Sequence, residues 1–125
     1  MTQQTAALRT IDRGNQSNVD EAKQAVARTQ AEWTALWKTH EYDRPAPQVD
    51  FAKEMVVAVF MGSRPTAGFA IEIVGAAVRD GALVVTYRQT LPPPDTITAQ
   101  IITSPYHMVA VAKHAGAVRF EKTDK

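Results

Sequence analysis

The stretch EMVVAVFMG, residues 54–62, decides the fold. From Met55 to Met61 it is apolar without a break and rich in β-branched residues, and Gly62 closes the run. A half-buried strand alternates apolar with polar residues, whereas a run without alternation is typical of a strand that is covered on both faces. We therefore expect these residues to form the central strand of the fold.

The main helix is predicted upstream, because the letters TQAE at residues 29–32 have the Ser/Thr-x-x-Glu form of a capping box. After this start, large side chains recur three and four positions apart, as on a helix with one buried face. These residues are Trp33, Leu36, Trp37 and His40. The pattern predicts a helix from Gln30 to His40 that buries both tryptophans in the core.

The stretches before and after the helix predict short elements and connections. Residues 7–12, ALRTID, predict a first strand, and the polar residues 13–18 predict a loop after it. Residues 23–28, KQAVAR, fit either a strand or a helix, because the stretch is too short to show its period. Residues 43–48, DRPAPQ, form a connection, since each proline lacks an amide donor and restricts the residue before it.

Residues 68–90 indicate a β-hairpin around their Asp-Gly pair. A two-residue loop would put Ile73 opposite Arg88, so that an apolar and a charged side chain would share a face. A three-residue loop ending in a left-handed glycine instead pairs Ile73 with Tyr87 and Glu72 with Arg88. We prefer the second register, which makes one face apolar and places an ion pair on the other.

The rest of the chain predicts three more strands. The proline run at residues 91–95, LPPPD, interrupts strand pairing. Strands are expected at residues 96–102 (TITAQII), 106–112 (YHMVAVA) and 117–122 (AVRFEK), with a turn at 113–116 (KHAG).

Length and composition set the fold class. A chain of 125 residues that is 45% hydrophobic suits one domain, residues 1–125, with a real core. We predict an α+β fold: a mostly antiparallel β-sheet, curled or sandwich-like, with the helix Gln30 to His40 packed on it.

Charge and hydropathy exclude several classes of partner. The 14 Lys and Arg residues against 13 Asp and Glu give a net charge of +1 without a dense basic stripe, so nucleic acid is not expected. No apolar stretch approaches the roughly 18 to 20 residues that span a bilayer, and residues 1–10 lack the apolar run of a signal peptide. We expect a cytoplasmic protein if Met1 is native, and an exported or cell-surface one if a leader was removed. Without cysteine the chain has no disulfide or thiol chemistry.

The letters TSPYHMVAV at residues 103–111 place Ser104 and His107 three positions apart. In an extended chain three residues span roughly 10 Å, well beyond a hydrogen bond, and no G-x-S-x-G elbow supports a nucleophile. We therefore interpret the segment as a proline-kinked strand start with a partly buried histidine. A hydrolase built on this pair is the weakest of three functional hypotheses.

No cofactor or metal site is expected. The histidines His40, His107 and His114 are scattered and have no cysteine partners. Residues 62–68, GSRPTAG, match no phosphate-binding motif and indicate a plain loop. A second functional hypothesis is a small-ligand domain with its pocket between helix and sheet, near Trp33, Trp37 and Tyr106.

Four stretches together resemble the conserved domain at the C-terminus of PrcB, a protease complex subunit. They are EWTALWKTH (32–40), VDFAKEMVVAVFMGSRPTAGFAIEI (49–73), LVVTYRQTLPPPD (83–95) and TSPYHMVAVAK (103–113). The TAG at residues 66–68 departs from the family turn, which often reads T-G-G. The resemblance implies a non-enzymatic module that associates with a protease in a complex and stabilises it, and it assigns no active site.

The leading hypothesis is thus a protein-interaction module whose partner is a protein, with a protease the candidate that the resemblance implies. If the hairpin register is right, the loops at 62–68 and 91–95 share one edge of the sheet. Prolines preorganise both loops, and arginine is enriched in interfaces. We predict partner contact through Arg64, Pro65, Thr66, Pro93 and Pro94, against the alternative that both loops merely cap the sheet.

Overall fold

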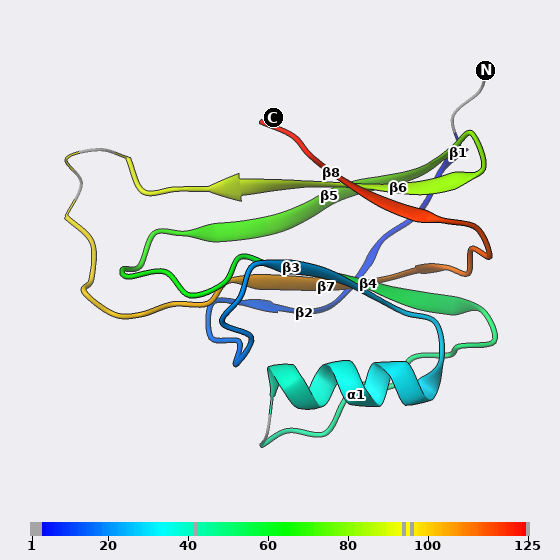
Figure 1. The fold of residues 1–125 in the computed structure, drawn as a ribbon, viewed down its shortest axis with the longest axis horizontal. Helices are drawn as coiled ribbons and strands as arrows, with labels where there is room; N and C mark the ends of the chain where they lie inside the picture. The colour runs from blue at the N-terminus through cyan, green and yellow to red at the C-terminus, as the bar shows by residue number, and fades with distance from the viewer. Residues whose placement is uncertain (1–3, 42, 94, 96, 125) are drawn as a thin grey trace.

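Two four-stranded sheets and one helix are stacked in three layers (Figure 1). The structure is a computed structural model, and it describes residues 4–41, 43–93, 95 and 97–124. Its elements are β1 (Gln4–Thr5), β2 (Arg9–Gly14), β3 (Lys23–Ala27), α1 (Gln30–His40), β4 (Glu54–Phe60), β5 (Ala70–Arg79), β6 (Ala82–Thr90), β7 (Tyr106–Ala112) and β8 (Val118–Lys122).

The two sheets differ in strand order and in strand direction. The middle layer, which we call the β4 sheet, has the order β2-β7-β4-β3 and is antiparallel throughout. The outer layer, the β5 sheet, has the order β1-β5-β6-β8, and its β8 runs parallel to β6. The helix covers the face of the β4 sheet that is turned away from the β5 sheet (Figure 1). The predicted α+β class is confirmed, in its sandwich-like form.

Strand β4 is central and covered on both faces, as its unbroken apolar run predicts. Val56, Ala58 and Phe60 belong to the cluster that packs under the helix. Met55, Val57, Val59 and Met61 belong to the cluster between the two sheets. All seven side chains are at most 2% exposed. Because each large apolar side chain contributes roughly 1.5 to 3 kcal/mol when fully buried, this strand is a main source of stability.

Helix α1 has the predicted bounds. Thr29 caps it, since its hydroxyl accepts a hydrogen bond from the Glu32 amide at 3.1 Å. In a capping box the Glu32 carboxylate would accept a hydrogen bond from the amide of the cap residue, Thr29. Here it accepts from the amide of the preceding residue, Arg28, at 2.7 Å. The predicted apolar face is buried, and the indole N–H of Trp37 donates to the Arg44 carbonyl at 2.7 Å. No helix in the described part of the chain has the length and apolar content needed to cross a membrane.

The ambiguous residues 23–28 contain strand β3, so the helical alternative is wrong. Strand β3 pairs antiparallel with β4 and forms one edge of the β4 sheet. The predicted first strand is β2, which lies at the opposite edge. Strand β1 precedes it and pairs with β5 in the other sheet, so the start of the described chain joins both sheets.

The hairpin prediction was right in its pairing at Ile73 and Glu72, and wrong in its turn and in the register of residues 75–79. Ile73 faces Tyr87 and Glu72 faces Arg88, and the Arg88–Glu72 ion pair measures 2.8 Å. The turn, however, has two residues, both with positive φ, as an Asp-Gly pair favours. A bulge between Ile73 and Gly75 takes up the extra residue, leaving Val74 unpaired.

The strand predicted at residues 96–102 was wrong for the part that the structure describes. Residues 97–102 are assigned to no strand, and Thr96 lies outside the described residues. Their apolar residues cannot alternate between a buried and an exposed face, because Ile97, Ile101 and Ile102 are all exposed. The strands predicted at 106–112 and 117–122 are confirmed as β7 and β8.

The role of Trp37 in the core can be tested by truncation. We expect Trp37→Ala to lower the free energy of unfolding by about 3 to 5 kcal/mol, because the indole is 3% exposed and its removal leaves a cavity. Chemical denaturation measures this loss. The matched control, Lys38→Ala on the exposed face of the same helix, should change stability by no more than about 0.5 kcal/mol. A loss below about 1 kcal/mol for Trp37→Ala would contradict the packing described here.

Candidate interaction surface

The two predicted contact loops lie side by side at one end of the molecule (Figure 1). Arg64 and Thr103 exchange backbone hydrogen bonds of 2.7 and 2.9 Å, and the Ala67 amide donates to the Ala99 carbonyl at 3.0 Å. The turn 62–68 is thereby fastened to the segment 91–102. Ala99 and Thr103 lie beyond the predicted loop 91–95, so the prediction of a shared edge is supported by the approach of Pro92 to Gly68 instead, and Pro94 lies outside the described residues.

Gly68 lies tightly against the second loop. Its φ of +98° disfavours any residue with a side chain, and a Cβ placed there would lie 2.9 Å from the Pro92 Cβ. The turn therefore needs glycine for two separate reasons, backbone conformation and space.

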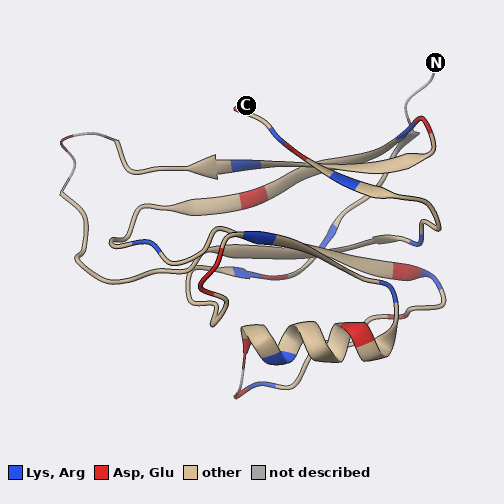
Figure 2. Ribbon diagram, viewed as in Figure 1, with Lys and Arg blue, Asp and Glu red and all other residues tan. Residues whose placement is uncertain are grey.

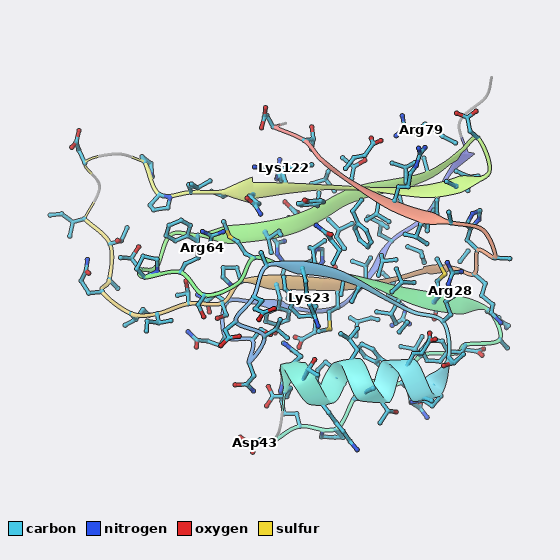
Figure 3. The ribbon with its side chains drawn as sticks, in the orientation of Figure 1. Lys23, Arg28, Asp43, Arg64, Arg79 and Lys122 are labelled. Atoms are coloured by element: carbon cyan, nitrogen blue, oxygen red, sulfur yellow. The ribbon has the colours of Figure 1, made fainter. Side chains whose placement is uncertain are left out.

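Arg64 is held against its own loop. Its side chain is half-buried, and Nη2 donates to the Met61 carbonyl at 3.2 Å. The guanidinium lies over the Phe69 ring, 5.6 Å from the centroid. Figure 3 shows Arg64 at the end of the molecule that carries both loops. A partner can therefore reach Arg64 in part, while Pro65 and Pro93 are exposed.

The exposed apolar side chains gather on the segment 91–102. Large hydrophobic residues exposed in the described chain are Val74 (39%), Leu91 (59%), Ile97 (98%), Ile101 (51%) and Ile102 (71%). Four of these five lie on that segment, whose stretch 97–102 carries no charge (Figure 2). Concentrated exposed apolar surface marks interaction sites.

Sequence reasoning missed these isoleucines because it placed them in a strand. The sequence held little signal against a strand, since Ile97, Ala99 and Ile101 alternate with polar residues and only Ile102 departs from that pattern.

Ser104 and His107 have separate hydrogen-bond partners. The Ser104 hydroxyl lies 3.3 Å from that of Ser63. The His107 ring accepts from the Ile73 amide at Nδ1, 2.9 Å away, and its Nε2 lies 2.9 Å from the Thr10 hydroxyl. Burial lowers the pKa of His107 to about 4.

A different serine lies in a hydrogen-bonded chain that sequence reasoning did not foresee. The Ser17 hydroxyl is 2.8 Å from His40 Nδ1, and His40 Nε2 is 3.1 Å from an Asp12 carboxylate oxygen. The order of groups is that of a serine hydrolase triad. The His40 ring is fully buried, however, and Ser17 is 8% exposed and also accepts the Val19 amide at 3.0 Å. This chain of bonds ties the loop after β2 to the end of α1.

The surroundings of His40 favour its neutral form. Burial lowers the pKa of its ring, and the Asp12 carboxylate partly offsets that effect. The adjacent Tyr106, whose ring lies 4.2 Å from that of His40, has its pKa raised to about 12, first by burial and then by its hydrogen bond to Asp12.

The predicted ligand pocket between helix and sheet is filled. Trp33, Trp37 and Tyr106 are 0%, 3% and 5% exposed, and the two indole rings pack 5.5 Å apart. The prediction of a pocket at these rings was wrong, because the rings are packed in the core. Both indole N–H groups also donate hydrogen bonds, to the carbonyls of Pro47 and Arg44.

Comparison with known proteins adds one relationship. Residues 55–112 match the model of the family described as PrcB C-terminal. The predicted resemblance is confirmed over this segment. It runs from β4 to β7 and includes both contact loops, whereas the EWTALWKTH helix lies outside it. No curated protein and no solved structure matches the chain.

The coupling of the two loops predicts a difference between two glycine substitutions. Gly68→Ala and Gly81→Ala both place a side chain at positive φ, but a Cβ at Gly81 meets no atom within 4 Å. We expect each variant to lose about 1 kcal/mol or more from backbone strain. Gly68→Ala should lose at least about 1 kcal/mol more, because it also clashes with Pro92. Equal losses in chemical denaturation would show that the loops are not tightly packed there.

Proposed function

We propose that this protein is a non-enzymatic interaction module that binds a protein partner through the edge formed by the turn 62–68 and the segment 91–102. The observation that carries the proposal is the concentration of exposed apolar side chains on that segment. The proposed contact residues are Leu91, Ile97, Ile101 and Ile102, with Arg64, Pro65, Thr66 and Pro93 at their border. The predicted contact at Pro94 lies outside the described residues.

Binding through this segment is favourable because exposed isoleucine side chains cost free energy in water. Burying these side chains against a partner stabilises the complex by roughly 25 cal/mol for each Å² of apolar surface removed from solvent. The scaffold suits this role, since the turn is held by the Arg64–Thr103 bonds and the close Gly68 approach. A surface held in place in this way loses little conformational entropy on binding.

The partner that the family resemblance suggests is a protease. A module that binds the folded protease, and not its unfolded chain, raises the stability of the protease by mass action without any chemistry of its own. At a free concentration one hundred times Kd the gain is about 2.7 kcal/mol.

The partner surface can be tested with serine substitutions. We expect the double variant Ile101→Ser and Ile102→Ser to lose at least tenfold in capture of a crosslinked native partner, because it removes two apolar contacts. Val74→Ser is the matched control, since Val74 is an exposed apolar residue on the β5 bulge, away from the segment. The measurement is quantitative pull-down from the native organism with melting temperature recorded in parallel.

Two outcomes would count against the proposal. Undiminished capture by a stably folded double variant would show that the segment is not the contact. Equal loss with Val74→Ser would show that general surface hydrophobicity, rather than this edge, is responsible.

The absence of enzyme activity is part of the proposal and needs its own experiment. We expect a serine-directed fluorophosphonate to leave the folded protein unlabelled, because Ser17 is enclosed and its hydroxyl is already bonded to His40 and Val19. Intact-mass spectrometry measures labelling, with a known serine hydrolase as positive control. Labelling that disappears in Ser17→Ala would show that the Ser17–His40–Asp12 chain is reactive.

A further inference from the structure

His107 is a polar side chain in the apolar layer between the two sheets. Its neighbours on β7 and β4 that share this layer are Val109 and Val59. Its ring is 4% exposed, so it occupies a place where an aliphatic residue would otherwise pack. A buried imidazole needs hydrogen-bond partners, and both of its nitrogens have one.

The partner of Nδ1 is the backbone of the other sheet. The amide of Ile73, next to the β5 bulge, donates to Nδ1 at 2.9 Å. On this side of β5, strand β1 pairs with Ala77 and Val78, and the Ala6 amide bonds to the Ala76 carbonyl. At Ile73, beyond these contacts with β1, the His107 imidazole accepts the amide hydrogen bond in place of a strand. This bond joins the β4 sheet to the β5 sheet.

The bond fixes where the proton of the neutral ring lies. A backbone amide can only donate, so Nδ1 must be the unprotonated acceptor. The ring proton is then on Nε2, where it is donated to the Thr10 hydroxyl on β2 at 2.9 Å. The ring, carried by β7, is therefore locked as a single tautomer by groups from two other strands, β5 and β2.

Protonation of this ring cannot leave the contact intact. A proton added at Nδ1 would point at the Ile73 N–H, so two donors would face each other. The charged groups nearby are Arg13 on β2, Glu72 on β5 and its partner Arg88 on β6. Burial is the main reason that the pKa of His107 is low; Arg13 lowers it further and Glu72 opposes the change.

His40 shows that burial alone does not produce this conflict. Its Nε2 faces the Asp12 carboxylate, which can accept from a charged ring, and its Nδ1 faces a hydroxyl. The Ser17 hydroxyl can reverse from donor to acceptor by rotation. A protonated His40 therefore keeps both contacts, whereas a protonated His107 loses one.

We propose that the His107–Ile73 hydrogen bond is an acid-sensitive clasp between the two sheets, which opens when the imidazole takes up a proton and releases β5 at its bulge. The released stretch follows directly from the turn 62–68, so opening also loosens the interaction edge. The clasp stands independently of the proposed function, and its effect on partner binding rests on that function.

The direction of the pH dependence follows from the two states. Unfolded histidine has a pKa near 6.5, and in the folded protein the pKa of His107 is about 4. The unfolded chain binds more protons between these values, so the contribution is complete above pH 6.5 and is lost as the pH falls toward 4. This group alone should lower the folding equilibrium constant about a hundredfold between pH 7 and pH 4.

The deciding experiment is an NMR titration of the native chain from pH 7 to pH 3.5. We expect imidazole ¹⁵N shifts of the Nε2–H tautomer for His107 at pH 7, and a common midpoint for His107 and the Ile73 amide. Below it, the exchange protection of Ile73, corrected for intrinsic rates, should fall at least tenfold further than that of Val57 in β4. An Nδ1–H tautomer at pH 7, or an Ile73 amide that keeps its protection while His107 titrates, would overturn the proposal.

Two variants separate the clasp from general acid unfolding. His107→Gln cannot take up a proton, so the Ile73 step should disappear, while His40→Gln should leave it in place. Persistence of the step in His107→Gln would assign it to another group and overturn the proposal; if that variant does not fold, the titration of the native chain decides. Capture of the partner at pH 7 and pH 4 is a separate measurement: its failure at both values would count against the proposed function, not against the clasp.

Discussion

The burial of β4 on both faces is the constraint on which the rest of the structure depends. A strand with Val56, Ala58 and Phe60 on one face and Met55, Val57 and Val59 on the other needs a cover on each side. Helix α1 supplies one cover and the β5 sheet supplies the other (Figure 1). The three-layer order is therefore a consequence of one apolar run, because neither face of β4 tolerates water.

The same constraint separates structural polar groups from functional ones. The layers on the two sides of β4 each contain a buried histidine. His40 bonds Ser17 in the loop after β2, and His107 bonds the Ile73 amide beside the β5 bulge. Buried polar groups of this kind are satisfied and specify the arrangement of the layers. The surface on which we place partner binding lies instead at the end of the sandwich, where the chain leaves both sheets and its isoleucines have no layer to enter.

Local sequence signals predicted the helix, the central strand and the register at Ile73, because each is set by periodicity or by neighbours in the chain. They failed where distant contacts decide. The bulge at Val74 depends on how β5 meets both β6 and His107, and the extended segment 97–102 depends on hydrogen bonds to the turn 62–68. Of the contact residues, the shared edge was predictable from the hairpin, whereas the inward position of Arg64 depends on Phe69 and Met61 in the folded turn.

The topology of the β4 sheet has a consequence for how the domain is made. Its edge strands β2 and β3 come from the first quarter of the chain, and its inner strands β4 and β7 come from the segment that matches the family. A fragment cut at the limits of that match would retain the inner pair but neither edge strand nor the helix, and so would present open strand edges and a bare apolar face. We expect such a fragment to aggregate rather than to fold by itself. Strands that pair with partners far away in the chain also make folding slow.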